Sequence, residues 1–280
     1  MAGVIGTFDV IVVGAGPAGG TAAILLAEVG RSVAIVDPLG IGGALINLEW
    51  VPDHPDHPGG IAGWDLAAEL GERVLDAGVE LILGTVDAVR ADGVEIDGGP
   101  RHSRAVLLAT GRRPNVLPGA EGLEGRGVSY CAACDGGMFA GQEVIVVGGG
   151  HEALAEAKTL AALASKVTVL CPEPSLAADA YWQAALAAEP NVEIIPGATV
   201  RQVTAATVVT GVDFERGGAL AHLAAAGVFG GLPGIPAAEL LIARDGLFSA
   251  GDIRPDAPRR IAAAIADARA VAADIDAWLG

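Results

Sequence analysis

Cys131 and Cys134 are separated by two residues in the stretch YCAACDG (130–136), and their spacing is the first feature of the chain that suggests chemistry. A CxxC arrangement allows a disulfide, lowers a thiol pKa from its free value of about 8.5, and also occurs in metal sites. On the residues alone, three interpretations are open. The pair is a redox centre, part of a metal site, or two buried thiols without a task.

A zinc site is weakly supported because it needs about four ligands. The chain has three cysteines and five histidines; the histidines are scattered, and the third cysteine, Cys171, stands alone. Cys171 ends the apolar run KVTVLC (166–171), and free cysteine packs as a small apolar residue. We therefore predict that Cys171 is a buried thiol at a strand end and that the chain holds no metal.

The charge balance restricts the partners. Lys and Arg number 17 against 34 Asp and Glu, a net charge of -17, which argues against nucleic acid or an anionic membrane surface as a partner. No basic segment precedes the first apolar stretch, so we expect no signal peptide and a reducing cytoplasm. The longest uncharged run, 217–238, is broken by glycines and prolines, and predicts core strand and turns rather than a membrane span.

The N-terminal region predicts a dinucleotide-binding fold. The apolar run FDVIVV (8–13) is followed by GAGPAG (14–19) and a helical stretch, TAAILLAEVG (21–30). In this arrangement Gly14 permits a tight turn, Gly16 lets the backbone approach a pyrophosphate, and Gly19 permits close packing of helix on strand. A second strand, SVAIVD (32–37), ends at Asp37, whose carboxylate can accept hydrogen bonds from ribose hydroxyls.

The same order recurs from residue 143, where EVIVV is followed by GGGHEA (148–153) and another helical stretch. Gly148 and Gly150 match the first two glycines of the motif, and Ala153 takes the third place, which tolerates alanine. Two further stretches, AVLLATG (105–111) and LFSAGD (247–252), each read as a strand running into a turn. Two dinucleotide folds suggest either two bound cofactors, or one bound cofactor and a second fold that was inherited and no longer binds one.

Taken in order, GAGPAG, GGALINLEWVPDHP (42–55), ATG (109–111), CAACDG, GGGHEA and LFSAGD resemble the flavin disulfide reductases, and among them the low-molecular-weight thioredoxin reductases of the pyridine nucleotide-disulfide oxidoreductase superfamily. The resemblance covers essentially the whole chain. Its most specific element is CxxC-Asp-Gly directly before the second glycine motif.

The resemblance implies an α/β fold with two Rossmann-like dinucleotide-binding domains of the three-layer ββα type, the second inserted in the first. Residues 1–112 with 245–280 would form the FAD-binding domain, and residues 113–244 an NAD(P)-type domain that carries the CxxC. A homodimer is also implied. In the mechanism of the family, Cys134 exchanges electrons with the flavin, Cys131 attacks the external disulfide and Asp135 shuttles the proton. The position of Asp135 directly after Cys134 favours this role over that of a simple turn carboxylate.

The resemblance also assigns residues to FAD. The first glycine turn and Asp37 would hold the adenosine diphosphate part. Gly42 and Gly43 would lie beside the flavin, and Asp252 would accept a hydrogen bond from the ribityl chain. Arg259 and the backbone after it would reach the pyrimidine edge of the flavin. The full set of expected cofactor-binding residues is Gly14, Gly16, Pro17, Ala18, Gly19, Asp37, Gly42, Gly43, Leu45, Asp53, Thr110, Gly111, Gly251, Asp252, Arg259, Arg260 and Ile261.

The second glycine motif departs from the family. Members that use NADPH carry arginines after the strand that ends here at Cys171, because a 2'-phosphate needs cationic donors. Residues 167–200 contain no Lys or Arg; Glu173 stands about where a family arginine would, and Glu152 brings a negative charge into the glycine turn. We therefore expect NADPH binding to be weak or absent, with NADH conceivable only if Glu173 meets a free 2'-hydroxyl.

The loop that would face the flavin departs as well. Ala44 replaces a family glutamine, Asp53 an asparagine and His54 an aromatic residue. His54 and His57 are interpreted as proton-handling groups near the flavin, as ligands of a metal, or as parts of a solvated loop. Arg260 would add a positive charge that stabilises reduced, anionic flavin.

The predicted function is a FAD-dependent thiol-disulfide oxidoreductase of thioredoxin reductase type. Its partner would be a thioredoxin-like protein or a small dithiol or disulfide, and its electrons would come from a donor other than NADPH, such as ferredoxin or a deazaflavin. A second hypothesis is a dithiol oxidase that passes electrons to oxygen, although such enzymes typically carry His where this chain has Asp135. A third is a flavin-binding redox sensor without turnover.

Overall fold

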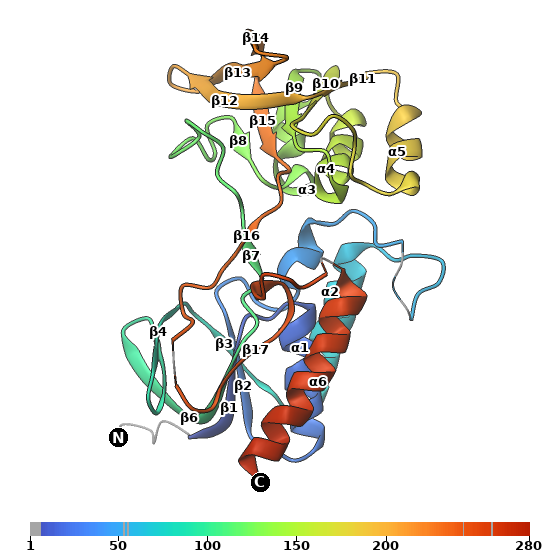
Figure 1. Ribbon diagram of the computed structural model, residues 1–280. Helices are drawn as coiled ribbons and strands as arrows, with labels where there is room; N and C mark the ends of the chain where they lie inside the picture. Colours follow the sequence, from blue (N-terminus) through green and yellow to red (C-terminus); the bar gives the residue numbers. More distant parts are fainter. Residues whose placement is uncertain (1–6, 53, 55, 243, 259) are drawn as a thin grey trace. The chain divides into compact units, whose positions relative to one another are not determined.

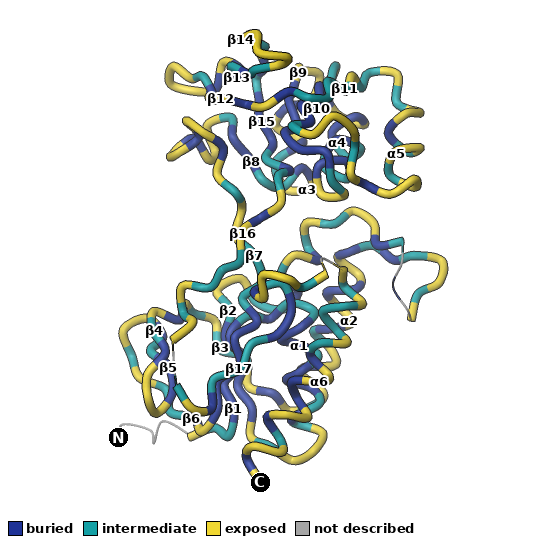
Figure 2. Tube along the Cα trace, viewed as in Figure 1, coloured by how far each residue is buried: buried dark blue, intermediate teal, exposed yellow. Residues whose placement is uncertain are grey.

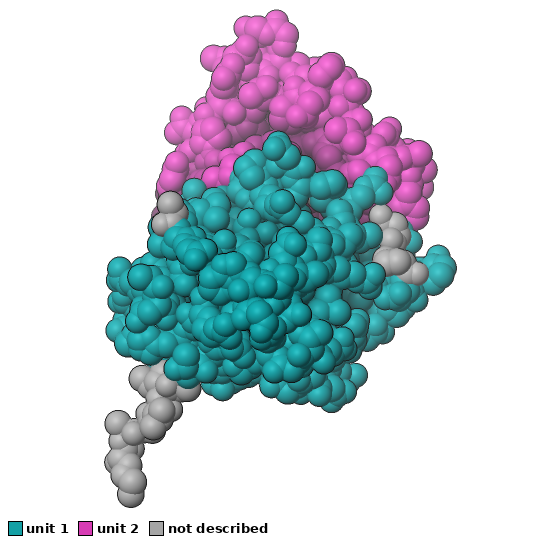
Figure 3. All heavy atoms as spheres, turned by 60° about the horizontal axis from the view of Figure 1, so that its bottom comes forward, with its two compact units in different colours: residues 1–113, 236–280 teal, residues 114–235 magenta. Residues whose placement is uncertain are grey.

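The computed structural model describes residues 7–52, 54, 56–242, 244–258 and 260–280. The chain forms two compact units, Met1–Arg113 with Pro236–Gly280, and Pro114–Ile235 (Figures 1 and 3). The sequence analysis placed the return to the first unit later, near Asp245. Each unit is built on a parallel sheet with helices packed against it, which confirms the predicted α/β class.

The first unit contains a seven-stranded sheet in the order β3-β2-β1-β6-β5-β4, in which β17 also pairs with β6. Strands β1, β2, β3, β6 and β17 are parallel, whereas β4 and β5 form an antiparallel extension from β6. The strands are β1 (Phe8–Val13), β2 (Val33–Asp37), β3 (Glu80–Leu83), β4 (Val86–Arg90), β5 (Gly93–Ile96), β6 (Gly99–Leu108) and β17 (Leu247–Ser249).

The strands β1 and β2 are buried on both faces, which explains why their sequences read as continuous apolar runs instead of alternating (Figure 2). One face packs against the helices in a cluster that includes Val10, Val12 and Ile35. The other face, with Ile11 and Val13, packs against β4 and β5. The helical segments of this unit are α1 (Pro17–Glu28), η1 (Gly43–Asn47), α2 (Gly63–Asp76), η3 (Gly251–Ile253) and α6 (Ile261–Leu279).

The second unit contains a five-stranded parallel sheet in the order β11-β10-β9-β15-β8 and a three-stranded antiparallel sheet, β12-β13-β14. The strands are β8 (Val128–Ser129), β9 (Glu143–Val147), β10 (Lys166–Cys171), β11 (Val192–Pro196), β12 (Ala198–Ala205), β13 (Val209–Arg216), β14 (Ala219–Ala224) and β15 (Gly227–Gly230). The helical segments are α3 (Ala132–Asp135), η2 (Gly136–Phe139), α4 (His151–Ala161) and α5 (Ala180–Ala187). Two short strands, β7 (Arg112–Arg113) and β16 (Ile235–Pro236), pair where the chain passes between the units.

The uncharged run 217–238 is only partly core. Strand β15 is buried, but β14 is exposed along almost its whole length (Figure 2). The prediction of a core strand was therefore wrong for β14. This strand is at the edge of the small antiparallel sheet, where its small side chains can be exposed to solvent at little cost. None of the helices in the described residues is long and apolar enough to cross a membrane.

Candidate active site

Four predicted cofactor segments meet at one edge of the first sheet. The strands β1, β2, β6 and β17 run parallel, so the turns that follow Val13, Asp37, Leu108 and Ser249 all leave the sheet at its carboxyl edge. In open α/β sheets this is the edge at which ligands bind. The topology therefore brings together the motifs GAGPAG, ATG and LFSAGD, which are far apart in the sequence.

Close backbone contacts hold these turns together. Gly14 has φ +101°, and a Cβ there would lie 2.4 Å from the carbonyl oxygen of Ala109. A Cβ at Gly43 would lie 2.8 Å from Gly16 Cα, and one at Gly251 would lie 2.8 Å from Ala18 Cβ. The expected residues Gly14, Gly16, Ala18, Gly43 and Gly251 thus form one cluster at the start of α1.

The Asp37 carboxylate closes the first glycine turn. Its Oδ2 accepts a hydrogen bond from the N–H of Ala15 at 3.0 Å, and its Oδ1 accepts one from the N–H of Leu39 at 2.9 Å. Helix α1 begins after Gly16 with no side-chain cap. Its first N–H groups therefore point at the space above Gly16, where an anionic group would be stabilised.

The other expected residues of this unit lie on the segments that carry or follow these turns. Leu45 is buried in η1, and Gly42 donates its N–H to the carbonyl of Ala15 at 2.9 Å. The Thr110 hydroxyl donates to the carbonyl of Ala237 at 2.7 Å, and Asp252 lies in η3. The remaining described members are Pro17, Gly19, Gly111, Arg260 and Ile261, of which Arg260 caps and Ile261 begins α6. Asp53 and Arg259 lie outside the described residues.

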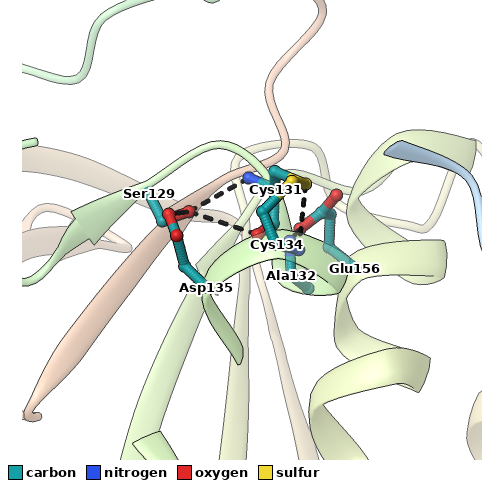
Figure 4. The surroundings of a disulfide bond; sticks show 6 residues. All are labelled: Ser129, Cys131, Ala132, Cys134, Asp135 and Glu156. Atoms are coloured by element: carbon teal, nitrogen blue, oxygen red, sulfur yellow. Dashed lines mark hydrogen bonds between the residues drawn. A yellow bond between two sulfur atoms is a disulfide. The ribbon is translucent and has the colours of Figure 1, made fainter. Parts of the chain in front are cut away.

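The CxxC pair lies at the carboxyl edge of the second sheet. Strand β8 ends at Ser129, and Cys131 and Cys134 form a disulfide with a Cα–Cα distance of 5.3 Å (Figure 4). Cys131 is the N-cap of α3: its Sγ accepts a hydrogen bond from the N–H of Cys134 at 3.1 Å, and its carbonyl accepts from the N–H of Asp135 at 3.0 Å. Cys131 is half-buried and Cys134 is exposed. The pair can therefore be reached by a reactant without unfolding the turn.

Asp135 is linked to the disulfide through Ser129. The Ser129 hydroxyl donates to Asp135 Oδ2 at 2.7 Å and accepts from the N–H of Cys131 at 3.1 Å. Ser129 is itself buried. This chain of hydrogen bonds fixes the Asp135 carboxylate beside the redox turn, as Figure 4 shows.

These motifs and their geometry match known proteins along the whole chain. A family model described as pyridine nucleotide-disulphide oxidoreductase matches residues 8–263. The thioredoxin reductase of Mycolicibacterium smegmatis is 31% identical over 299 residues, which cover 97% of this chain and 96% of that protein. A bifunctional thioredoxin reductase/thioredoxin from Mycobacterium leprae is 32% identical over 300 residues, with 97% of this chain and 66% of the relative covered. The crystal structure of Lactococcus lactis thioredoxin reductase in its FR conformation superposes with a TM-score of 0.90 at 26% identity, covering 97% of this chain and 99% of that one.

The chain belongs to the pyridine nucleotide-disulphide oxidoreductase family. The resemblance noted in the sequence is confirmed, and the protein is a flavin disulfide oxidoreductase of thioredoxin reductase-like type. Membership of this family implies FAD. The first glycine turn fits that cofactor, because it offers an uncapped helix start, an open space above Gly16 and a carboxylate held at Asp37.

The second glycine turn is built differently from the first. A Cβ at Gly149 would lie 2.3 Å from Cys171 Sγ and 3.4 Å from Glu173 Oε2. The Gly149 carbonyl accepts hydrogen bonds from Ala177 and Ala178, at 2.8 and 3.2 Å, so the loop after β10 lies against the turn. The side chains of Cys171 and Glu173 therefore lie against Gly149, in the middle of the second glycine turn.

The groups around this second turn are acidic. His151, the first residue of α4, pairs through Nε2 with Asp179 Oδ2 at 2.8 Å, and Glu152 follows it in the first turn. Cys171 ends β10 and is buried, as predicted. Burial, together with the negative charge of Glu173, raises the pKa of the Cys171 thiol, so this cysteine is held as a neutral thiol.

His54 and His57, which were predicted to lie near the flavin, are close to each other. His54 is buried and accepts a hydrogen bond at Nδ1 from the N–H of Asp56 at 3.2 Å. His57 pairs through Nε2 with Glu69 Oε2 at 2.9 Å, and the two ring centroids are 5.2 Å apart. In the part of the chain that the structure describes, no three His, Cys, Asp or Glu side chains gather as metal ligands.

Two polar residues at the CxxC turn were missed in the sequence analysis. Ser129 precedes Cys131 by two residues in β8, and Glu156 reaches the turn from α4. Glu156 Oε2 accepts a hydrogen bond from the N–H of Ala132, the first residue of α3. A signal for Glu156 was present: it is charged, yet it shares a helix face with the buried Ala153 and Leu160, three and four residues away.

Proposed function

We propose that this family member is a FAD-dependent thiol-disulfide oxidoreductase of thioredoxin reductase type, in which Cys131 and Cys134 are the redox pair and NADPH is not the electron donor. The observation that carries the proposal is the accessible disulfide at the carboxyl edge of the second sheet, flanked by a held carboxylate. FAD, held by the first glycine turn with Asp37 and by the turns after β6 and β17, would supply two-electron redox chemistry.

The cysteines perform the exchange with the external partner. In the reduced pair the Cys131 thiolate attacks one sulfur of a disulfide substrate, forms a mixed disulfide and releases the other substrate sulfur as a thiol. Cys134 then attacks Cys131 Sγ, which restores the internal disulfide and frees the second substrate thiol. Asp135, fixed by the Ser129 hydroxyl, is positioned to exchange protons at the turn.

The second glycine turn supports the exclusion of NADPH. A pyrophosphate bound there would meet Glu152, Glu173 and Asp179 with no Lys or Arg between residues 167 and 200 to balance them. Repulsion between unit charges about 4 Å apart costs on the order of 1 to 4 kcal/mol for each pair at surface dielectric. The side chains of Cys171 and Glu173 also occupy the space above Gly149.

The partner we propose is a thioredoxin-like protein or a small disulfide, served by a homodimer in the cytoplasm. The relatives support this choice, since one of them combines thioredoxin reductase and thioredoxin in a single chain. With NADPH set aside, the electrons would come from a ferredoxin, a deazaflavin or a small dithiol.

An anaerobic titration of the FAD-loaded protein tests the proposal. Dithiothreitol is expected to bleach the flavin absorbance, because it reduces the CxxC pair, whereas one equivalent of NADPH or NADH is expected to leave the absorbance unchanged within minutes. Fast stoichiometric bleaching by NADPH would show that the acidic second turn still binds a nucleotide. If none of the three reductants bleached the flavin, the disulfide would not exchange electrons with it, and the proposal would be wrong.

A further inference from the structure

Glu156 is the second carboxylate at the redox turn. It comes from α4, and its Oε2 accepts a hydrogen bond from the N–H of Ala132, directly after Cys131. In the view of Figure 4, Glu156 and Asp135 stand on opposite sides of the disulfide, and Glu156 points at the start of α3. The side chain is half-buried, and Ala132, to which it binds, is buried.

The surroundings of Glu156 disfavour its negative charge. Burial, with added repulsion from Glu152 and Asp135, raises the carboxyl pKa from 4.5 to about 7, while the Ala132 N–H opposes this rise. The other titratable side chains on the elements packed against α4 are Glu143 of β9, Lys166 and Cys171 of β10 and Tyr181 of α5. Lys166 pairs with Glu193, and Lys158 of α4 pairs with Glu189, so these two cations are engaged elsewhere.

Reduction of the disulfide adds a further negative charge to this turn when one sulfur becomes a thiolate. A thiolate near an ionised carboxylate raises the carboxyl pKa, because like charges disfavour each other. A group placed to respond to that charge is a carboxyl bound to the backbone next to Cys131. That group is Glu156, which contacts the same turn of backbone that carries Cys131.

We propose that Glu156 is a positioning residue that takes up a proton when the Cys131–Cys134 disulfide is reduced and releases it when the disulfide forms again. This inference rests on the proposed redox role of the pair. With a dithiol as reductant, two electrons pass to the cysteines, the Cys131–Cys134 bond breaks and a disulfide forms in the reductant. Of the two thiol protons released, one goes to one cysteine sulfur and the other to the Glu156 carboxylate, leaving the second sulfur as a thiolate.

The pH window follows from the direction of the shift. Below about pH 7, Glu156 already carries its proton in the oxidised protein, so reduction changes nothing at this group. Above that pH the oxidised protein has lost the proton and the reduced protein still holds it. The reduction equilibrium constant of the wild type, relative to that of a variant with a neutral side chain here, is therefore constant below about pH 7. Above it the ratio declines by about tenfold for each pH unit until the pKa of Glu156 in the reduced protein is reached, because one proton is linked to the step.

The experiment measures this equilibrium on the FAD-loaded full-length protein between pH 6 and 9. Samples are equilibrated without oxygen in dithiothreitol buffers of known ratio, and the free thiols are counted by alkylation and mass spectrometry. For the ratio of wild type to Glu156→Gln equilibrium constants, we expect a flat profile below about pH 7 and a decline of about tenfold per pH unit above it. Glu152→Gln removes a charge one turn away and keeps both the Glu156 carboxyl and its contact with Ala132. Because it also removes part of the repulsion that raises the Glu156 pKa, its ratio to wild type is expected to change only by a small factor near pH 7, without the sustained tenfold decline.

A flat Glu156→Gln profile, or an identical decline in Glu152→Gln, would overturn the assignment to Glu156. If Glu156→Gln does not fold, the infrared difference spectrum of the wild type upon reduction at pH 8 tests the proposal instead. Proton uptake by Glu156 is expected to add a carboxylic acid C=O band. The absence of this band would reject the proposal. A disulfide that dithiothreitol leaves intact at every pH would overturn the proposed redox function itself, and this inference with it. The two failures are therefore distinguishable.

Discussion

The variant Cys134→Ser is expected to lose thiol-disulfide turnover by about 10³-fold or more while it still binds FAD. A serine hydroxyl can neither form the internal disulfide nor resolve a mixed disulfide, since thiolate chemistry is required at both steps. The backbone of the turn should persist, because the N–H of residue 134 still faces Cys131 and α3 needs no side chain from this position. Turnover is followed by reduction of a disulfide substrate with a photoreduced flavin as electron source, and FAD content by absorbance.

The matched control for this prediction is Cys171→Ala. Cys171 is fully buried at the end of β10 and its raised thiol pKa keeps it unreactive. Its replacement is expected to cost some stability through the lost sulfur contacts and to leave turnover within about twofold of wild type. Wild-type turnover by FAD-loaded Cys134→Ser would show that the exchange takes place elsewhere in the chain.

The parts of the site that could be predicted from sequence are those in which each step is local. A β-branched run, a glycine turn and a helix follow one another within about twenty residues, and the chemistry of that turn predicts the roles of Gly14 and Gly16. The parallel strands then force the turns after β1, β2, β6 and β17 to the same sheet edge. Local patterns and one topological rule were therefore sufficient to predict that these turns meet, whereas FAD binding by these residues stays a prediction.

The contacts that could not be predicted join residues with no shared local pattern. Glu156 binds the N–H of Ala132 across 24 residues, and His151 pairs with Asp179 across 28. The acidic residues of the loop after β10 were visible in the sequence, but not the fold of that loop back onto Gly149. The sequence shows which residues of this loop are charged, whereas the positions of their side chains depend on packing.

The prediction that the segment of β14 is a core strand was wrong for a related reason. Its alanines and leucines read as apolar, yet its neighbour β13 is paired on both sides and the small sheet leaves β14 at an edge. A short run of small apolar residues does not distinguish a core strand from an exposed edge, because the cost of exposing alanine is low. Burial is a property of the partners of a strand, and the sequence of that strand does not contain them.

The two glycine turns allow a direct comparison of the two nucleotide folds. Gly16 and Gly150 are equivalent N-caps of α1 and α4, with φ, ψ of -78°, -169° and -90°, -175°, which a β-branched residue tolerates. A Cβ at Gly16 would meet only Gly43 Cα at 3.8 Å, and one at Gly150 would meet no atom within 4 Å. A Cβ at either position is therefore accommodated by the protein, and the unfolding of each valine variant checks that its γ-methyl groups are accommodated as well.

We expect Gly16→Val to lower FAD affinity by about tenfold or more, because its methyl groups fill the space that the pyrophosphate would occupy above the first turn. Gly150→Val is expected to leave both FAD content and dithiol-driven flavin reduction unchanged, since no nucleotide is proposed to use the second turn. FAD retention is measured by absorbance after dialysis, and thermal unfolding of the apoproteins checks that both variants fold. Full FAD retention by a folded Gly16→Val variant would show that FAD does not bind at the first turn. Loss of donor-dependent flavin reduction in Gly150→Val would show that the second turn binds an electron donor after all.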